Sequence, residues 1–212
     1  MEVRSFTVGP VAENTYLIRR DGSDRALLID PGDEAERLLN VIRELGLELD
    51  AILLTHTHFD HVGAVAPIAR ETETEVWVPE IEKGVLADIM SYVPWPGFGP
   101  YESWDAEHTV RGGEKLELAG LEIDVLFTPG HSPGHVTYSI PDETVVFSGD
   151  VLFQGSVGRV DLPGGDWPTL LESLRKLVDT LPPETTVYPG HMGITTLGAE
   201  RASNPFLAEL AR

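Results

Sequence analysis

Short apolar stretches alternate with helical patterns through the first third of the chain. Alternating apolar and polar positions, together with β-branched residues, predict five strands in this part. They cover Val3–Val8, Thr15–Ile18, Ala26–Ile29, Ala51–Thr55 and Glu75–Val78. Between the third and fourth strands, apolar residues at helical spacing predict a helix with Asp33 as its N-cap and Gly46 at its end.

The second half of the chain repeats this pattern. We expect a hairpin of Lys115–Leu118 and Leu121–Phe127, because two alternating stretches flank the turn Ala119-Gly120. Three further strands are predicted at Val136–Ile140, Thr144–Phe147 and Thr185–Tyr188. Leucines at helical spacing predict a helix near Pro168–Leu181. A last helix is predicted near Thr196–Leu210, bent or restarted at Asn204-Pro205.

The two halves resemble each other locally, and no linker or low-complexity stretch separates them. Thr15–Ile18 and the following Leu27–Asp33 resemble Thr137–Ile140 and the following Val145–Asp150. Two similar sheet-forming halves favour a two-sheet sandwich with helices outside over one parallel sheet. We therefore predict a single domain over residues 1–212, of the α/β (α+β) class.

Composition narrows the classes of protein. Hydrophobic residues make up 42% and charged residues 24% of the 212 positions, which excludes wholesale disorder. The absence of cysteine excludes disulfides, thiolate ligands and a cysteine nucleophile. A net charge of −20 argues against nucleic-acid binding, which needs a basic face. Apolar runs are far shorter than the ~20 residues of a membrane helix, and the first residues lack a signal-peptide pattern, so we expect a cytoplasmic protein.

Histidines and an aspartate cluster directly after the apolar strand at Ala51–Leu54. Within Thr55–His61, alternate residues of an extended segment point the same way, so His56 and His58 can grip one ion together. Asp60 and His61 follow where the chain turns into a helix beginning near Val62, and can face a second ion. Imidazole and carboxylate ligands suit zinc, manganese or iron.

Three further candidate ligands each follow an apolar strand. His131 lies in Thr128-Pro-Gly-His131, Asp150 in Phe147-Ser-Gly-Asp150 and His191 in Tyr188-Pro-Gly-His191. Ligand sites in layered α/β proteins gather at the carboxyl ends of strands. The glycine before each ligand lets the backbone approach a metal closely. We therefore predict one metal site that draws on four strand ends.

These motifs resemble those of metallo-β-lactamase-fold hydrolases, and most closely the glyoxalase II-like (hydroxyacylglutathione hydrolase-like) branch. The resemblance rests on His56-Thr-His-Phe-Asp-His61, the His131 and Asp150 segments, Gly155–Asp161 and Gly190-His191. It implies a four-layer αββα sandwich with a dinuclear site. Metal 1 is then held by His56, His58 and His131. Metal 2 is then held by Asp60, His61 and His191, and Asp150 bridges the two ions.

The resemblance also implies a reaction. Two divalent ions, zinc first and iron or manganese as alternatives, lower the pKa of bound water towards neutrality. A metal-bridging hydroxide then attacks the carbonyl of a small acyl-thioester, so no side-chain nucleophile is needed. Asp60 and Asp150 are the predicted catalytic residues. The expected partner is a small-molecule substrate, with no nucleic acid and no membrane, and the chain is expected to be a monomer or a homodimer.

For several other residues near these motifs, the sequence leaves alternative roles open. His135 either orients a ligand or packs in the core, and Asp30 either contacts a ligand imidazole or caps the next loop. Arg159 binds a substrate carboxylate or, more simply, forms an internal salt bridge with Asp161. His108 is predicted to be a solvated loop residue. The aromatic segment from Tyr92 to Trp104 either walls a pocket, connects elements or contacts a second chain.

Departures from glyoxalase II concern substrate recognition. That enzyme carries a C-terminal helical region whose basic residues bind glutathione, whereas 21 residues follow His191 here. It has a tyrosine where this chain has Gly193, and a further tyrosine is replaced around Asp161. Two alternatives therefore stay open. One is a persulfide dioxygenase with a single iron on His56, His131 and Asp150, and the other is a lactonase or other ester hydrolase of the same fold.

Overall fold

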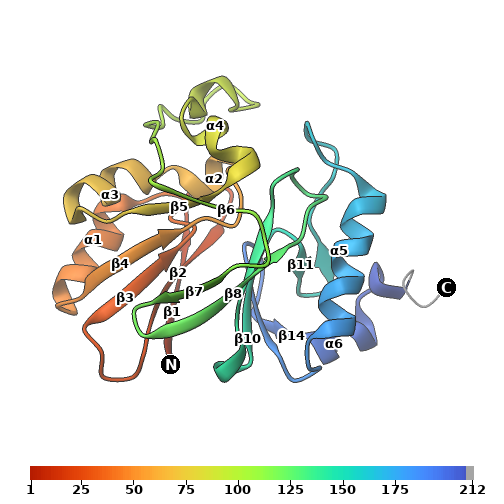
Figure 1. The fold of residues 1–212 in the computed structure, drawn as a ribbon. Coiled ribbons are helices and arrows are strands. Elements are labelled where there is room, and N and C mark those ends of the chain that lie inside the picture. The colour runs from red at the N-terminus through yellow and green to blue at the C-terminus, as the bar shows by residue number, and fades with distance from the viewer. Residues whose placement is uncertain (209–212) are drawn as a thin grey trace. The chain divides into compact units, whose positions relative to one another are not determined.

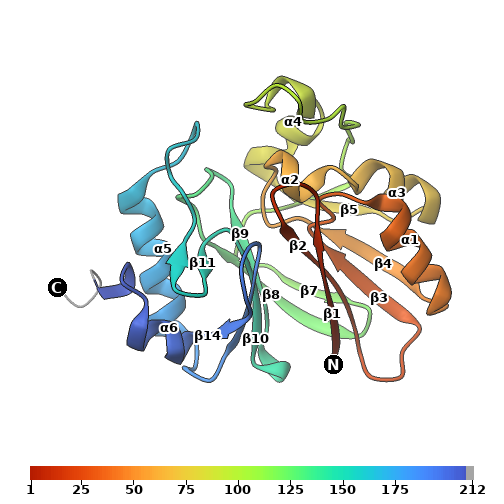
Figure 2. The same cartoon turned by 180° about the vertical axis from the view of Figure 1, so that it is seen from behind.

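The computed structural model describes residues 1–208, which form two compact units (Figures 1 and 2). Unit 1 comprises Met1–Val110 and Glu117–Leu121, and unit 2 comprises Arg111–Leu116 and the chain from Glu122 onward. The chain forms two mixed six-stranded sheets with helices, the first in unit 1 and the second in unit 2 apart from the residues of β7 and β8 that fall within Glu117–Leu121. The prediction of a single domain stays a prediction.

The sheet of unit 1 has the strand order β1-β2-β3-β4-β5-β6. Its strands are β1 (Glu2–Val8), β2 (Glu13–Arg19), β3 (Arg25–Ile29), β4 (Glu48–Leu53), β5 (Val76–Pro79) and β6 (His108–Val110). The first three pair antiparallel, and β3 to β6 pair parallel. The helices are α1 (Ala35–Glu44), α2 (Phe59–Val62), α3 (Val65–Thr72) and α4 (Lys83–Leu86), with 3₁₀ turns at Glu80–Glu82 and Ile89–Ser91.

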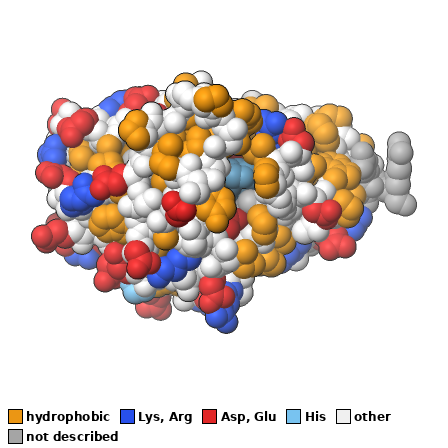
Figure 3. All heavy atoms as spheres, turned by 90° about the horizontal axis from the view of Figure 1, so that it is seen from above, with side chains coloured by type: hydrophobic (Ala, Val, Ile, Leu, Met, Phe, Trp, Pro, Cys, Tyr) orange, Lys and Arg blue, Asp and Glu red, His pale blue; other side chains and the backbone are white. Residues whose placement is uncertain are grey.

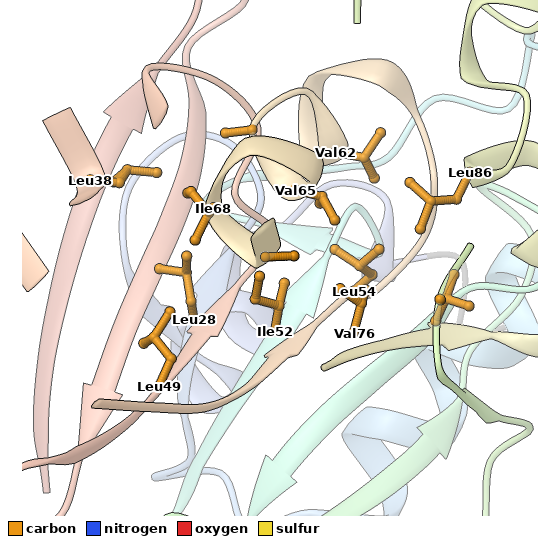
Figure 4. Close-up of a cluster of buried hydrophobic side chains, with 14 of the residues drawn as sticks. Leu28, Leu38, Leu49, Ile52, Leu54, Val62, Val65, Ile68, Val76 and Leu86 are labelled. Atoms are coloured by element: carbon orange, nitrogen blue, oxygen red, sulfur yellow. The ribbon is translucent and has the colours of Figure 1, made fainter. Parts of the chain in front are cut away.

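The core of unit 1 lies between this sheet and its helices (Figure 4). Helix α1 buries Leu38 and α3 buries Ile68, and both pack in one cluster with Leu28, Ile52 and Val76 of the strands. Burial of each such side chain contributes about 1.5–3 kcal/mol. The packing fixes where β4 ends, and therefore where the histidine-rich segment after it begins.

The sheet of unit 2 has the strand order β14-β13-β10-β9-β8-β7. Its strands are β7 (Lys115–Leu118), β8 (Leu121–Phe127), β9 (Val136–Ile140), β10 (Val145–Gly149), β13 (Thr186–Pro189) and β14 (Thr195–Thr196). A two-stranded ribbon of β11 (Leu152–Phe153) and β12 (Ser156–Val157) follows β10. The helices are α5 (Trp167–Thr180) and α6 (Leu197–Ser203), and Leu170, Leu174 and Leu177 of α5 pack in the core.

The predicted strands are confirmed, with small shifts at their ends, and two other expectations are corrected. Helix α1 has Glu34, in a left-handed conformation, as its N-cap, and Asp33 Oδ1 accepts a hydrogen bond from the Glu34 N–H instead of capping the helix. The predicted interruption of the C-terminal helix at Asn204-Pro205 is confirmed, since α6 ends at Ser203 and a 3₁₀ turn begins at Leu207; Pro205 disfavours a helical residue before it. The end of that predicted helix, at Leu210, lies outside the described residues.

The second correction concerns His108, which the sequence placed in a solvated loop. It begins strand β6 instead, and its Nε2 lies 2.6 Å from a Glu75 carboxylate oxygen. Its ring stacks on Trp77 of the neighbouring strand with the centroids 4.2 Å apart. This edge strand is too short and too polar to show an alternating pattern. The stacking on Trp77 and the polar contact with Glu75, both tertiary, hold His108 in the sheet.

Surface charge in unit 1 is mixed rather than segregated. On the left part of the face drawn in Figure 3, acidic and basic side chains lie side by side. One such pair, Arg43 with Glu71 at 2.8 Å, joins α1 to α3. Among the described residues, no helix is long and apolar enough to cross a membrane.

Candidate metal centre

The first group of candidate ligands lies in unit 1, directly after β4. Beyond Leu54, whose N–H still donates to Trp77 of β5, the chain leaves the sheet, bends at Thr55 and enters α2 after His58. His56 Nε2 and His58 Nδ1 lie 3.1 Å apart. Two ligand atoms about 2.1 Å from a common ion at a tetrahedral angle are separated by roughly 3.4 Å. The spacing of these two nitrogens therefore fits one shared ion.

Asp60 and His61 form a second pair in the first turn of α2. Their Oδ2 and Nε2 atoms lie 3.8 Å apart. On the other side of the imidazole, His61 Nδ1 lies 3.1 Å from Asp30 Oδ2. This contact confirms the predicted role of Asp30 beside an imidazole. It fixes the orientation of the ring, because a carboxylate at one ring nitrogen selects the tautomer that presents the other nitrogen as a ligand.

Asp30 also orders the first pair through Thr55. Its Oδ1 accepts the backbone N–H of Thr55 at 2.7 Å, and its Oδ2 accepts the Thr55 hydroxyl at 2.6 Å. The same hydroxyl oxygen lies 3.0 Å from His56 Nδ1. Asp30 adopts φ of +47°, an uncommon conformation for a residue with a side chain. Such a strained conformation persists where surrounding contacts hold it in place, and the hydrogen bonds between Asp30 and Thr55 do so here.

Glu13 is a buried carboxyl beside this group that the sequence did not reveal. Its Oε2 accepts a hydrogen bond from Thr15 Oγ1 at 3.1 Å, and its Oε1 lies 3.7 Å from His61 Nδ1. Burial raises the pKa of the Glu13 carboxyl well above its usual range. In the sequence, Glu13 resembles an ordinary polar residue at the start of a strand. Its burial arises only from tertiary packing, which leaves no local signal.

Replacement of Glu13 by glutamine should stabilise the metal-free protein at neutral pH. The folded-state pKa lies above the unfolded value, so the unfolded chain ionises first as the pH rises and stability is lost between the two pKa values. Glutamine carries no proton to lose. We expect E13Q to raise the thermal midpoint by a few degrees at pH 7 and hardly at pH 4, whereas E36Q on the exposed face of α1 should change neither. Equal shifts at both pH values would contradict this explanation.

The second group of candidate ligands lies in unit 2, and each member follows a strand as predicted. His131 follows β8, Asp150 follows β10 directly, and His191 follows β13. Asp150 Oδ2 lies 3.5 Å from Nε2 of His131 and 3.5 Å from Nε2 of His191. Both distances match the separation of two ligands on one ion. Asp150 is thus the carboxylate that both histidines of unit 2 face.

The backbone around Asp150 and His131 is held by buried partners. His135 is fully buried, and its Nε2 accepts the Asp150 backbone N–H at 3.0 Å while its Nδ1 lies 3.1 Å from Thr128 Oγ1. His135 therefore orients a candidate ligand, one of its two predicted roles. His131 Nδ1 lies 2.7 Å from the Arg159 carbonyl oxygen, which directs Nε2 of the same ring toward Asp150.

The Arg159 side chain forms the predicted salt bridge with Asp161. Two hydrogen bonds of 2.6 and 2.7 Å join the guanidinium to the carboxylate. The Arg159 guanidinium holds the pKa of the Asp161 carboxyl at about 2. Both side chains are more than half exposed, so the pair is worth little to folding stability. Arg159, which the sequence suggested as a binding group for a substrate carboxylate, is therefore already paired with a carboxylate of the protein.

The aromatic segment from Tyr92 to Trp104 packs beside the ligands of unit 1. Phe59, between His58 and Asp60, contacts Phe98 and Tyr101 with ring centroids 4.8 and 5.8 Å apart. Tyr101 and Asp60 both line a shallow hollow. Val8, Pro10 and Val11 supply apolar parts of the same wall. Tyr101 is the residue of this segment among those lining the hollow, and the prediction that the segment walls a pocket stays a prediction.

With this geometry in hand, comparison with known proteins gives the family. The family model of the metallo-beta-lactamase superfamily matches residues 8–191. The chain therefore belongs to the metallo-beta-lactamase superfamily, and the predicted fold class, the metallo-β-lactamase fold with two mixed sheets and helices, is confirmed. Membership makes it a metallo-hydrolase of that superfamily.

Two relatives cover nearly the full chain. The chain is 41% identical to the probable metallo-hydrolase YqgX of Bacillus subtilis, over 98% of each protein. It is 37% identical to the hydroxyacylglutathione hydrolase GloC of Haemophilus influenzae, again over 98% of each.

Two crystal structures are similar at the level of the fold. BLEG-1, a B3 metallo-beta-lactamase, matches with a TM-score of 0.92 and 38% identity over 97% of this chain and 99% of its own. TTHA1623 in a di-iron-bound form matches with a TM-score of 0.85 and 44% identity over 97% of this chain and 100% of its own. The family thus includes a protein that holds two irons, so family membership leaves the identity of the metal open.

Proposed function

We propose that this protein is a dinuclear metal-dependent hydrolase that cleaves a small acyl-thioester. The observation that carries the proposal is the spacing of paired donors in each unit. His56 and His58 in unit 1, and Asp150 with each of its two histidines in unit 2, are 3.1–3.5 Å apart. The assignment of His56, His58 and His131 to one ion, and of Asp60, His61 and His191 to the other, is part of the proposal.

The donor set fits divalent metal ions. Every candidate ligand is an imidazole or a carboxylate, and thiolates are absent from the chain. Zinc is the first choice for such a set, and iron or manganese binds the same donors. Asp30, Thr128 and the Arg159 carbonyl sit behind the ligands or their supporting residues, as the outer contacts of metal sites commonly do. Asp150 is proposed as the ligand shared by both ions.

Two bound divalent ions would supply an activated water and polarise a carbonyl group at neutral pH. The protein would contribute orientation and proton acceptance. The side chains of Asp60 and Asp150 keep 15% and 9% of their surface exposed, whereas His56 and His61 are fully buried. Asp60 and Asp150 are therefore carboxylates with exposed surface, and we assign to them the acceptance of a proton from the reacting water and its orientation toward the substrate carbonyl.

Support for a thioester comes from the relative GloC, a hydroxyacylglutathione hydrolase. The leaving group need not be glutathione here. Arg159 is paired with Asp161, and a β-carbon on Gly193 would lie 2.5 Å from Gln154 Oε1, so the side-chain amide fills the place of a larger residue. We therefore propose a small, soluble acyl-thioester as the partner, and no nucleic acid or membrane.

A side-by-side assay tests this function. Protein purified without chelator is analysed for bound metal and then assayed for hydrolysis of S-lactoylglutathione and of an acetyl-thioester of N-acetylcysteamine. Oxygen uptake with glutathione persulfide and hydrolysis of a β-lactam are measured in parallel, the latter because BLEG-1 is a B3 metallo-beta-lactamase. A chelator-treated sample and the same sample with metal restored are the controls.

We expect cleavage of at least one thioester, its loss on chelation and its recovery with a divalent metal. Oxygen uptake and β-lactam cleavage should stay near background. A single iron per chain, with oxygen consumption and no thioester cleavage, would overturn the proposed hydrolase and identify the protein as a dioxygenase. Cleavage of the β-lactam alone would keep the metal site and overturn the substrate class.

A further inference from the structure

The segment His56–His61 contains two residues that are not candidate ligands, Thr57 and Phe59. The imidazoles of His56 and His58 contact each other, whereas the hydroxyl of Thr57 between them contacts Glu82. Both Thr57 and Phe59 are buried. Their contacts therefore decide how firmly the ligand-bearing backbone is held.

Thr57 is held by Glu82, from the 3₁₀ turn Glu80–Glu82 that follows β5. Glu82 Oε2 accepts the Thr57 backbone N–H at 2.7 Å and the Thr57 hydroxyl at 3.0 Å. The backbone here has left the sheet, so a side-chain carboxylate takes the part that a neighbouring strand would otherwise play. Glu82 is 4% exposed, and a hydrogen bond from a buried N–H to a carboxylate is among the stronger kinds.

Phe59 is held from the same part of the chain. Its ring contacts Trp95 at 6.0 Å and Phe98 at 4.8 Å between centroids, and packs nearly parallel to Tyr101. Close packing continues one turn on, where a β-carbon on Gly63 would lie 2.8 Å from the Tyr101 ring. Residues 80–101 thus contact both positions of the segment that are not candidate ligands.

We propose that Glu82 and the aromatic residues Trp95, Phe98 and Tyr101 act as a brace for the ligand segment, with Glu82 as a positioning residue for the metal held by His56 and His58. This inference rests on the metal-binding part of the proposed function. Glu82 has no contact with an ion in this scheme and acts through Thr57. Removing its carboxylate would leave a buried N–H without an acceptor and allow the backbone between the two histidines to move.

Two substitutions at Glu82 separate its hydrogen bonds from its charge. Glu82→Gln keeps an oxygen in place for Thr57, whereas Glu82→Met keeps the volume and removes both acceptors. Supporting contacts of metal ligands are worth about 10- to 100-fold in affinity. We expect E82M to weaken the first zinc by that factor and E82Q to remain within about threefold of the wild type. Glu80→Met, on the exposed neighbour in the same turn, is the matched control.

The readouts are zinc affinity by competition with a chromophoric chelator and the visible absorption spectrum of the cobalt(II) protein, neither of which requires turnover. A changed cobalt spectrum in E82M and an unchanged one in E82Q and E80M would support the brace. Wild-type affinity and spectrum in a folded E82M would overturn it. If E82M does not fold, Thr57→Val and Thr57→Ser take its place, with weaker binding expected for the valine variant and equal affinities contradicting the proposal.

These outcomes are distinct from failure of the proposed function. Wild-type protein that binds two ions but cleaves no thioester contradicts the thioesterase and leaves the brace in place. Wild-type protein that binds no divalent metal contradicts both. Weaker binding in E82M and E82Q alike would assign the effect to the negative charge rather than to the hydrogen bonds, and would also overturn the brace.

Discussion

Replacement of Asp150 by alanine should reduce hydrolysis by about a thousandfold or more and leave fewer than two ions per chain. In unit 2, Asp150 Oδ2 is the atom that both His131 and His191 face, each at 3.5 Å. Loss of this group should therefore weaken both proposed metal positions at once.

The control for Asp150→Ala is Asp142→Ala, on an exposed turn between β9 and β10. Metal content by mass spectrometry and initial rates at saturating metal are measured for both variants. The control should keep two ions and the full rate. If D150A also retained two tightly bound ions, the assignment of Asp150 as the shared ligand would be wrong, whatever its rate.

Replacement of Gly158 by alanine should have the second largest effect. A β-carbon here would lie 1.9 Å from the Asp150 carbonyl oxygen and 3.1 Å from His131 Nδ1, so the backbone must move. The shift would displace the neighbouring Arg159 carbonyl, which lies 2.7 Å from that same nitrogen. We expect a loss of about 1–3 kcal/mol in the free energy of unfolding and a 10- to 100-fold loss of metal affinity.

Gly84 offers a matched control for Gly158. It lies in α4, is exposed, and a β-carbon on it would meet no atom within 4 Å. Gly84→Ala should leave metal affinity unchanged and stabilise the fold slightly, since alanine favours the helix by up to about 1 kcal/mol. Chemical denaturation of the metal-free proteins, with zinc competition on the same samples, measures both quantities. Wild-type values in G158A would show that the turn tolerates a side chain there.

The strand-end ligands could be predicted from the sequence because their positions follow from local pattern. His131, Asp150 and His191 each come after an apolar stretch and a glycine. An apolar stretch predicts a buried strand, and a residue so soon after it must lie near the end of that strand. The strands themselves were predictable for the same reason, since alternation is a local property that packing rarely overrides in a long sheet.

Residues that support the ligands were harder to predict. Glu13 and Glu82 are buried carboxyls whose partners lie 48 and 25 positions away in the chain, at His61 and Thr57. A single sequence shows them as ordinary polar residues, because their surroundings are created only when the strands assemble. His135 is intermediate, since its proximity to His131 suggested a role but left its partner, the Asp150 backbone, undetermined.

The N-cap of α1 shows a different limit. Asp33 has the side chain that commonly caps a helix, yet Glu34 takes that position with φ of +55°. The Asp33 side chain does not cap the helix. It lies against Gly9 and lines the same hollow as Asp60 and Tyr101. Tertiary contacts at the site thus overrule a local preference, which is where sequence-based prediction of helix ends most often fails.

The central claim is the proposal that two divalent ions, held by histidines and aspartates, make this protein a thioester hydrolase. Titration of the metal-free protein with zinc, with bound metal and thioester hydrolysis followed on the same samples, tests it most directly. The account predicts binding that saturates at two ions per chain and a rate that reaches its maximum only as the second ion binds. Saturation at one ion, or two bound ions with no cleavage of any acyl-thioester, would contradict it.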